Sequence, residues 1–464
     1  MTGNLTLDEA AVAELAAGMR GEVIRPDHPQ YDEHRAIWNG SIDRRPSAIA
    51  RCAGVSDVMS AVGFASRSGV LTAVRSGEHS FPGHSACDDG LIIDLGLLKG
   101  IRVDPEARIA RVQAGVLLGE LDHETQAFGL AVPAGIVTHT GVAGLTLGGG
   151  IGWIMRKYGL TIDQLRSVDV VTADGEFVKA SEDSNADLFW GVRGGGGNFG
   201  IVTEFEFNLN PLGPTVLAGP IFWPMKDAPE VLRFYRDWIA DAPDDLMTLV
   251  VCRLAPNLPV VPPDLVGKPV VAVAVCYAGD IEDGERCVAP LKGFGSPVLD
   301  LCAPKPFVAH QAMFDPAFRR GCWYYIRACD VAGLTDEVID ITVDYCTRIN
   351  SPITSIALWQ RGGETARVGE DETAFGGRDA AFTFNINGNT ETADGFEEQR
   401  AWARGFWTAL EPHHQGAYVN FMHDEGEDAI RKTYGAAKYD RLKALKKKYD
   451  PENLFRLNQN IRPD

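Results

Sequence analysis

The sequence predicts an α+β protein with two domains, and three observations support this. The length of 464 residues exceeds the usual size of a single hydrophobic core. Short strand-like runs alternate with helical patterns through the first 208 residues, with frequent turns between them. Residues 210–214 (NPLGP) then interrupt the pattern, and beyond them strands and amphipathic helices continue without Gly-rich loops. We therefore expect a boundary near residue 212, followed by a second α+β domain that carries an antiparallel sheet.

The first half contains two clear helical patterns and a series of short strands. Residues 5–20 are expected to form a helix, and apolar spacing over 55–66 predicts a second helix with Ser56 as its N-cap. Short apolar runs bounded by turn residues are typical of strands. The strands expected on this basis are residues 47–52, 71–74, 91–95, 110–114, 168–172 and 201–208.

In the second half, residues 228–240 and 336–349 have the spacing of amphipathic helices. Beyond residue 421 the chain returns to polar helix and a short tail, and the basic run 443–448 is expected to be a solvated helix face. The strands expected here are residues 249–252, 270–276, 353–359 and 382–386.

Bulk properties exclude several classes of function. The formal net charge of −19 disfavours binding to nucleic acids or anionic membranes. No apolar run approaches the roughly 20 residues of a membrane span, and the N-terminal residues lack a leader pattern, so a cytoplasmic protein is expected. The nine cysteines are odd in number, scattered and mostly within apolar runs, which predicts reduced thiols. None has metal-ligand spacing, so no metal site is expected.

Three Gly-rich segments are the strongest functional signal: residues 72–84 (TAVRSGEHSFPGH), 141–153 (GVAGLTLGGGIGW) and 190–200 (WGVRGGGGNFG). Small residues allow backbone N–H groups to converge on an anion, and the first segment also presents His79 at its tip. Three such loops in one domain predict a large phosphate-bearing cofactor. Residues 195–200 also match G-x-G-x-x-G, but a helix precedes them and a strand follows, opposite to the dinucleotide fingerprint. The alternative to cofactor contact is that these glycines form only a helix C-terminus and a turn.

The order and the residue sequences of these segments resemble those of the FAD-linked oxidases of the vanillyl-alcohol oxidase superfamily, and more narrowly those of the berberine bridge enzyme-like branch. The likeness spans nearly the whole chain and includes residues 158–165 (YGLTIDQL), 187–193 (DLFWGVR), 201–207 (IVTEFEF) and 449–461 (YDPENLFRLNQNI). The resemblance implies a two-domain PCMH-type FAD-binding fold. Its FAD-binding domain would be residues 1–212, its substrate domain residues 213–421, and residues 422–464 would return to the FAD-binding domain.

The resemblance also implies how the flavin is attached. In the family, the histidine of an Arg-x-Gly-x-His pattern bonds to the flavin 8α-methyl carbon, which assigns this role to His79; an ordinary surface-turn histidine is the alternative. Glu78 stands where glycine is commoner, so that its carboxylate either points outward or is offset by Arg75. Some relatives form a second bond through a cysteine, and Val137 occupies that position here. A single 8α-histidyl bond is therefore expected, similar to 6-hydroxynicotine oxidase-type members.

The remaining flavin contacts are expected from the three loops, the strand after the third loop, and the C-terminal segments. For His84, an exposed loop position is an equal alternative. Besides His79, the expected cofactor-binding residues are Arg75, Ser76, Gly77, Glu78, Ser80, His84, Val137, Thr140, Gly141, Gly144, Gly148, Gly149, Gly152, Gly200, Ile201, Val202, Asn420, Asn458 and Asn460.

Candidate catalytic residues come from both halves. Asn385 and Asn387 alternate with apolar residues, so a strand would place both amides on one face, with a solvent-facing strand edge as the alternative. In the family a base or base-assisting residue sits near the Asn387 position, but asparagine cannot act as a general base. Tyr418 matches a family strand that also contains Asn420, and it would either deprotonate the substrate, if its pKa were lowered, or simply pack.

His139 and Thr140 are two further candidates, and each has a purely structural alternative. His139 is a candidate base or a loop histidine that makes one hydrogen bond. Thr140 aligns with the position that controls oxygen access in the family, where a small residue favours oxidase activity; a turn-capping hydroxyl is the alternative.

Together these features predict an FAD-dependent oxidase that transfers a hydride from a small alcohol, amine or sugar to covalently bound flavin, with reoxidation by O2 to H2O2. A flavin dehydrogenase of the same fold with a non-oxygen acceptor, and a non-catalytic flavin-binding protein, are the alternatives. The expected partners are a small-molecule substrate and O2, with no nucleic acid or membrane, in a monomer or homodimer.

Overall fold

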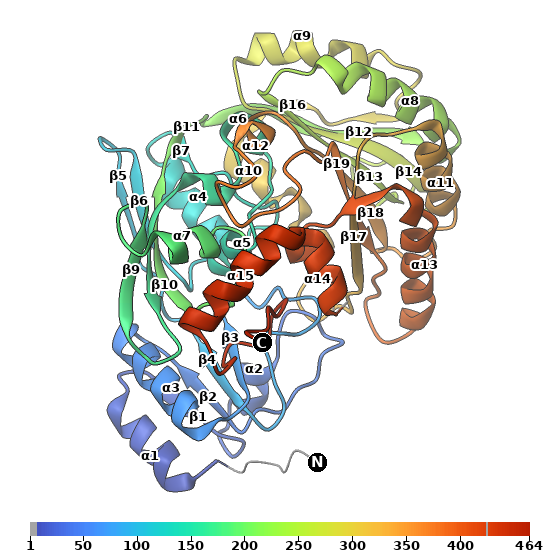
Figure 1. Ribbon diagram of the computed structural model, residues 1–464. Helices are drawn as coiled ribbons and strands as arrows, with labels where there is room; N and C mark the ends of the chain where they lie inside the picture. The colour runs from blue at the N-terminus through green and yellow to red at the C-terminus, as the bar shows by residue number, and fades with distance from the viewer. Residues whose placement is uncertain (1–6, 424–425) are drawn as a thin grey trace.

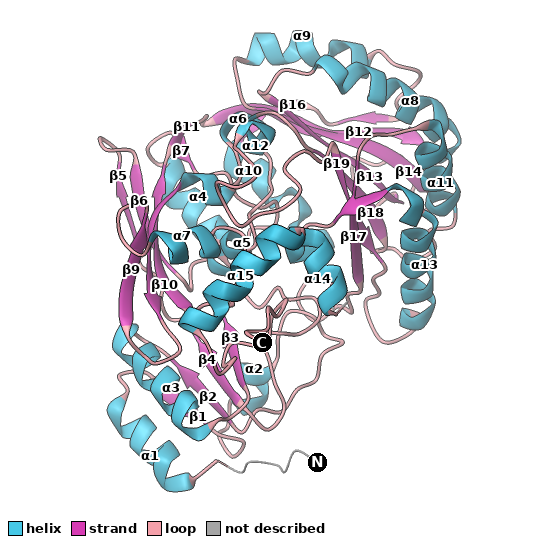
Figure 2. Cartoon of the chain, in the orientation of Figure 1, coloured by secondary structure: helices cyan, strands magenta, loops and turns pink. Residues whose placement is uncertain are grey.

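The computed structural model describes residues 7–423 and 426–464. The N-terminal half forms one side of the molecule, the second half forms the other, and the C-terminal helices lie across the region between them (Figure 1). Both sides combine sheets with helices (Figure 2), so the predicted α+β class is confirmed.

The N-terminal sheet has four strands, in the spatial order β1 (Glu22–Ile24), β2 (Ala48–Arg51), β4 (Leu91–Asp94), β3 (Thr72–Arg75). Strands β2, β3 and β4 are parallel, and α3 (Val55–Ser68) connects β2 to β3. Helix α3 buries Val58 and Val62, which repeat at helical spacing, and it ends at Gly69 in the left-handed conformation. Two further helices lie in this part, α1 (Glu9–Gly18) and α2 (Tyr31–Arg35).

The start of α3 differs from the expectation that Ser56 is its N-cap. The N-cap is Gly54, one residue before the first helical position. No described side chain caps this end; Asp57 in the first turn instead connects the helix to the segments before it, because its carboxylate accepts the backbone N–H groups of Gly21 (2.9 Å) and Ala53 (2.8 Å). A carboxylate in the first turn also interacts favourably with the helix dipole.

A second sheet is antiparallel, in the order β5 (Ile101–Asp104), β6 (Ile109–Gln113), β10 (Ile201–Asn208), β8 (Leu165–Val171), β9 (Phe177–Ser181). Its central strand β10 alternates buried Phe205 and Phe207 with less buried glutamates, as a strand with one buried face requires. A two-stranded ribbon and four helices complete this part: β7 (Leu130–Ala131), β11 (Asn210–Pro211), α4 (Leu118–Gln126), α5 (Val142–Leu147), α6 (Met155–Tyr158) and α7 (Ala186–Val192).

The second half is built on a nine-stranded antiparallel sheet. Alternate residues of its strands face opposite sides, so that Val250 and Cys252 pack with the outer helices while Leu249 and Val251 face the first half. The strand order is β15 (Leu299–Asp300), β12 (Thr215–Pro224), β14 (Pro269–Tyr277), β13 (Leu246–Leu254), β18 (Ser355–Gln360), β19 (Phe382–Asn387), β17 (Ile326–Val331), β20 (His414–Gly416), with β16 (Ala303–Pro306) also on β12.

Four helices cover the outer face of this sheet (Figure 2). They are α8 (Ala228–Trp238), α9 (Ile281–Lys292), α11 (Asp336–Thr347) and α13 (Phe396–Ala409). Two short helices, α10 (Phe307–Gln311) and α12 (Glu364–Arg367), lie toward the first half. The inner face of the sheet therefore remains for the functional site.

Helix α15 (Ala436–Tyr449) packs on α7 of the first half, whereas α14 (Glu427–Tyr434) contacts α15 and strand β20 of the nine-stranded sheet (Figure 1). Leu442 of α15 shares a hydrophobic core with Leu188 and Phe189 of α7. Residues 443–448 were expected to form a solvated basic face, but they are only partly solvated, because Lys446 is fully buried.

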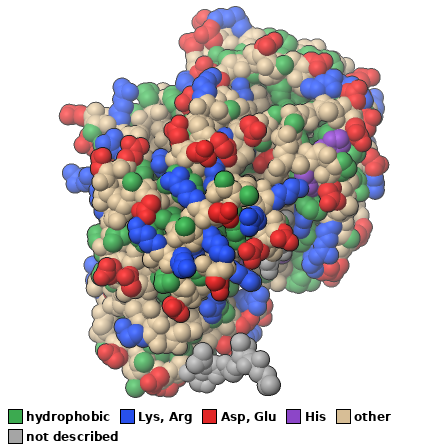
Figure 3. Space-filling model, viewed as in Figure 1, with side chains coloured by type: hydrophobic (Ala, Val, Ile, Leu, Met, Phe, Trp, Pro, Cys, Tyr) green, Lys and Arg blue, Asp and Glu red, His purple; other side chains and the backbone are tan. Residues whose placement is uncertain are grey.

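The visible surface mixes acidic and basic side chains without a large region of one sign (Figure 3). No helix among residues 7–423 and 426–464 is both long and apolar enough to cross a membrane. All nine cysteines are free, and only Cys287 is not fully buried.

Candidate active site

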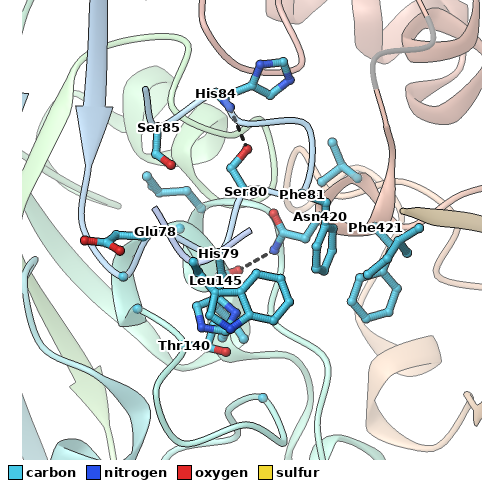
Figure 4. A pocket seen from close by; sticks show the side chains of 18 of the residues that line it. Glu78, His79, Ser80, Phe81, His84, Ser85, Thr140, Leu145, Asn420 and Phe421 are labelled. Carbon is cyan, nitrogen blue, oxygen red and sulfur yellow. Dashed lines mark hydrogen bonds between the residues drawn. The ribbon is translucent and has the colours of Figure 1, made fainter. Parts of the chain in front are cut away.

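A cavity of about 370 Å3 lies between the Gly-rich loops and the inner face of the nine-stranded sheet. It brings together segments that are far apart in the sequence, and Figure 4 shows several of its lining side chains. Most of its lining comes from residues within 76–85, 135–151, 196–202, 418–422 and 455–459 and from strands β13, β18 and β19.

The first Gly-rich loop follows β3 and is held against the second by direct backbone contact. A Cβ atom on Gly77 would lie 2.1 Å from the backbone nitrogen of Gly141, so both positions require glycine. Ser76 Oγ donates to the carbonyl of Ala114 at 2.5 Å, and Ser80 Oγ accepts from the N–H of His84 at 3.0 Å. The loop therefore has a defined shape along the cavity wall.

Glu78 and Arg75 belong to ion pairs. The Glu78 carboxylate pairs with Arg320 and points away from His79 (Figure 4), while its backbone takes a left-handed φ of 66°. Arg75 donates to Asp94 at 2.6 Å and its side chain is buried. Arg75 lines a second cavity beside the loop and is not among the residues that line the large one. Its expected place in the phosphate cradle is therefore not supported by where its side chain lies.

His79 is packed between aromatic and imidazole rings. Its ring stacks on Trp38 with centroids 4.4 Å apart, and Trp38 stacks in turn on Tyr324 at 3.7 Å. His79 Nε2 lies 2.8 Å from His139 Nδ1. Burial, reinforced by the neighbouring His139 and Arg320, holds the pKa of His79 well below its ordinary value. The imidazole is therefore neutral at physiological pH, which is the nucleophilic form.

His139 is the hydrogen-bond partner of His79 and is not itself among the residues lining the large cavity. Burial lowers its pKa, with Asp315 acting in the opposite direction. Two neutral imidazoles can share one proton across a 2.8 Å contact, with one ring donating and the other accepting. The position of His139 therefore suits hydrogen bonding to His79 better than direct contact with a substrate.

Val137 and Thr140 both line the cavity. The backbone of Thr140 closes a turn, because its N–H donates to the carbonyl of Val137 at 3.1 Å, while its side chain remains beside His79 (Figure 4). No cysteine among the described residues lines this cavity. The Val137 position thus has no thiol nearby that could replace the missing one.

The predicted glycines divide into two groups. At Gly144 an added Cβ would meet nothing within 4 Å, so this position borders open cavity space, and Gly197 of the third loop does the same. Gly200, Ile201 and Val202 also line the cavity. By contrast, Gly148, Gly149 and Gly152 pack against protein and are absent from the lining; an added Cβ would clash with Asn420, Phe375 and Ala134 respectively.

Asn385 and Asn387 line the cavity from β19 and are buried, so the alternative of a solvent-facing strand edge is wrong. Asn387 Nδ2 donates to the carbonyl of Asn385 at 3.2 Å. Its Oδ1 is buried and has no hydrogen-bond partner among the described residues. Nδ2 carries two hydrogens and the bond to Asn385 uses one, so the amide retains a donor for a ligand.

Tyr418 and Asn420 both line the cavity, but not from the strand that was expected: Asn420 lies in a short 3-10 turn, Val419–Phe421, and Tyr418 directly precedes it. Tyr418 Oη accepts the N–H of Gly150 (3.0 Å) and Nδ2–H of Asn420 (2.8 Å). Burial raises the pKa of Tyr418, whereas these donors and Arg361 oppose the rise. At neutral pH the phenol therefore keeps its proton.

The C-terminal tail is locked beside the third Gly-rich loop by a buried ion pair. Lys446 Nζ donates to Asp450 (2.6 Å) and to the carbonyls of Asn198 and Phe455 (2.9 Å each). Asn458 lines the cavity with a buried, unpaired Oδ1, whereas Asn460 is not part of the lining. Sequence reasoning missed Lys446, although its four-residue spacing from Asp450 is a recognised helix-pair signal.

These observations fit a flavin dinucleotide. Gly144 and Gly197 leave open space where any side chain would intrude, and Ser85 and Asn458 present buried oxygens without partners among the described residues. A neutral imidazole stands on the same cavity. No group of three or more metal-ligating side chains is found within residues 7–423 and 426–464.

Comparison with known proteins agrees with this geometry. A family described as an FAD binding domain matches residues 46–181, and one described as berberine and berberine like matches residues 417–462. An FAD-linked oxidoreductase of Dictyostelium discoideum is 31% identical over 457 residues, which cover 97% of each chain. The (R)-6-hydroxynicotine oxidase of Paenarthrobacter nicotinovorans is 30% identical over 469 residues, covering 96% of this chain and 97% of the relative.

Solved structures give the same result. The crystal structure of 6-hydroxy-D-nicotine oxidase from Arthrobacter nicotinovorans superposes with a TM-score of 0.87 at 31% identity, over 96% of this chain and 98% of that one. Glucooligosaccharide oxidase from Acremonium strictum, described with a 6-S-cysteinyl, 8α-N1-histidyl FAD, gives a TM-score of 0.86 at 25% identity, over 98% and 100% of the two chains. The chain therefore belongs to the berberine bridge enzyme-like family of FAD-linked oxidoreductases.

Proposed function

We propose that this protein is an oxidase that binds FAD through a single 8α-histidyl bond to His79 and passes a hydride from a small alcohol, amine or sugar to the flavin, with O2 reoxidising it to H2O2. The observation that carries the proposal is the neutral His79 ring on a cavity shared by three Gly-rich loops. Residues 1–212 and 422–464 would hold the cofactor, and residues 213–421 would present the substrate face.

Single attachment is supported by the lining of the cavity. Val137 offers no nucleophile, and no described cysteine reaches the lining. Under this proposal the chain would differ from the relative whose FAD is described with a 6-S-cysteinyl bond. We expect mass analysis of flavin peptides to show one attachment, and two cross-linked peptides would contradict the assignment.

When bound, the flavin supplies the electron acceptor, so the protein must position the substrate and handle its proton. Asn387 lines the cavity and is placed to orient a polar group of the substrate through its side-chain amide. Tyr418 Oη is our choice for the group that receives the substrate proton, because two N–H donors fix its orientation and would stabilise its ionised form. Trp359 and Phe421 form an apolar wall of the cavity beside Tyr418.

The oxidase proposal is tested on the flavin-loaded enzyme. Denatured wild-type protein should keep its yellow fluorescence on a gel, and His79→Ala should lose it while retaining loosely bound FAD. Anaerobic mixing with alcohols, amines and oligosaccharides should then identify compounds that bleach the flavin. Rapid recovery of colour in air, with H2O2 formed in equal amount, supports an oxidase. Slow recovery would indicate a dehydrogenase, and no bleaching by any compound would indicate a flavin-binding protein without turnover.

A further inference from the structure

A polar row crosses the inner face of the nine-stranded sheet at one end of the cavity. Arg253 of β13 pairs in register with Ser355 of β18, and Ser355 pairs with Asn387 of β19. All three residues line the cavity. Because directly paired residues of antiparallel strands carry their side chains on the same face, the guanidinium, the hydroxyl and the amide form one continuous strip.

Arg253 lacks a carboxylate partner. Its Nε and Nη2 donate to the backbone carbonyls of Leu254 (3.2 Å) and Pro352 (3.3 Å), which are neutral. No Asp or Glu among the described residues forms an ion pair with it, and no hydrogen bond to a described residue reaches its Nη1. Burial lowers the pKa of Arg253, and no nearby acid offsets that effect. Arg253 is half-buried, and a ligand that fills the cavity would withdraw its guanidinium further from water, which is costly unless the ligand supplies the opposite charge.

The rest of the cavity does not neutralise this charge. Among the described residues that line it, Glu78 is the one carboxylate and Arg253 is the one lysine or arginine. Glu78 belongs to the loop after β3 and is already paired with Arg320. In a chain with a formal net charge of −19, an isolated arginine facing a ligand cavity is a specific feature rather than part of a basic surface.

Next to the polar row the same sheet face is apolar. Val251 pairs with Ala357, and Leu249 pairs with Trp359, both pairs lining the cavity. Trp359 stands four residues from the Ser355 row, which at the rise of a strand is about 13 Å along the sheet. Its ring is 6.0 Å from that of Phe421, which lies 4.8 Å from that of Tyr418. An apolar wall thus connects the arginine to the tyrosine.

We infer that the substrate of this enzyme carries a carboxylate, which accepts hydrogen bonds from the Arg253 guanidinium, the Ser355 hydroxyl and an Nδ2–H of Asn387, at the opposite end of an apolar body from the carbon that is oxidised. The planar guanidinium suits a carboxylate because both groups present two parallel hydrogen-bonding atoms. The inference rests on the proposed function and narrows it, since neutral sugars and simple amines lack the charge that this row would bind.

Binding without turnover provides the test. On flavin-loaded enzyme, isothermal titration with 3-phenylpropanoate and its neutral isostere 3-phenylpropanamide compares ligands that differ only in charge. We expect the wild-type enzyme to prefer the carboxylate by about tenfold or more. Arg253→Met should abolish that preference, and Arg253→Lys should restore part of it. Arg319→Met, which removes an exposed arginine paired with Glu391, is the matched control and should retain the wild-type preference.

Equal affinity for acid and amide throughout the phenylalkanoate series from two to five carbons would overturn the inference, as would a preference that survives in Arg253→Met. These outcomes are separate from a failure of the proposed function. Absence of flavin bleaching would exclude the oxidase but leave the titration intact, whereas bleaching by neutral alcohols with no carboxylate preference would retain the oxidase and exclude the anion site.

Discussion

Replacing Tyr418 with phenylalanine removes one oxygen atom that accepts two hydrogen bonds inside the cavity. The N–H of Gly150 and one Nδ2–H of Asn420 lose their acceptor. Leaving a buried donor unsatisfied costs about 1–3 kcal/mol, so the free energy of unfolding should fall by about 2–6 kcal/mol in total. This is measured by denaturant unfolding at pH 7, where the phenol is protonated in both the folded and unfolded states.

The catalytic effect of the same variant is separable from the structural one. A general base contributes about 10²- to 10⁴-fold, so the rate of flavin reduction should fall by that factor in Tyr418→Phe. Burial raises the pKa of Tyr418 above its ordinary value. Over pH 7–9.5 only a small fraction of the phenol is ionised, and that fraction grows with pH. The wild-type reductive rate should therefore rise by about tenfold per pH unit, and the variant should lose this slope.

Tyr434→Phe is the matched control, because Tyr434 is equally buried but donates to the carbonyl of Gly194 and does not line the cavity. It should lose stability while keeping the wild-type reductive rate and pH slope. Anaerobic stopped-flow measurement of flavin bleaching compares the three proteins. If Tyr418→Phe reduces the flavin at the wild-type rate, or if the wild-type profile is flat over this pH range, Tyr418 is not the base.

Three further predictions concern attachment, oxygen and the tail. His139→Ala removes the ring that contacts His79 Nε2, so covalent flavin should form more slowly when apoprotein is mixed with FAD; in-gel fluorescence over time measures this, and an unchanged rate would limit His139 to packing. Thr140→Leu should slow reoxidation by O2 and leave flavin reduction nearly unchanged, whereas equal slowing of both half-reactions in stopped flow would mean that Thr140 shapes the pocket. Lys446→Met leaves the buried Asp450 carboxylate unpaired and should cost about 3–5 kcal/mol of stability. The double variant Lys446→Met/Asp450→Asn removes the unpaired charge and keeps an amide oxygen that can accept the N–H of Leu454 or Phe455. It should recover part of this loss in denaturant unfolding, and no recovery would show that the unpaired charge is not the cause.

Local pattern was sufficient for much of the fold. Strand β10 and the helix before its Gly-rich loop follow from residues that are adjacent in the chain, and both form as expected. Alternation over 384–387 correctly placed Asn385 and Asn387 on one face of a strand. Period-2 and period-3.6 patterns report local geometry directly, because the backbone fixes where successive side chains point.

The sequence by itself thus determined the α+β class, the three glycine-rich loops and the histidine at the tip of the first. Only the tertiary structure decided what faces the cavity. His79 and His139 are separated by 60 residues and meet through two loops, and Arg75 turned to Asp94 instead of the cavity. The row of Arg253, Ser355 and Asn387 depends on the register of three strands spread over more than a hundred residues. Strand register is set by long-range packing and turn geometry rather than by any one segment, so this row could not be found before the strands were paired.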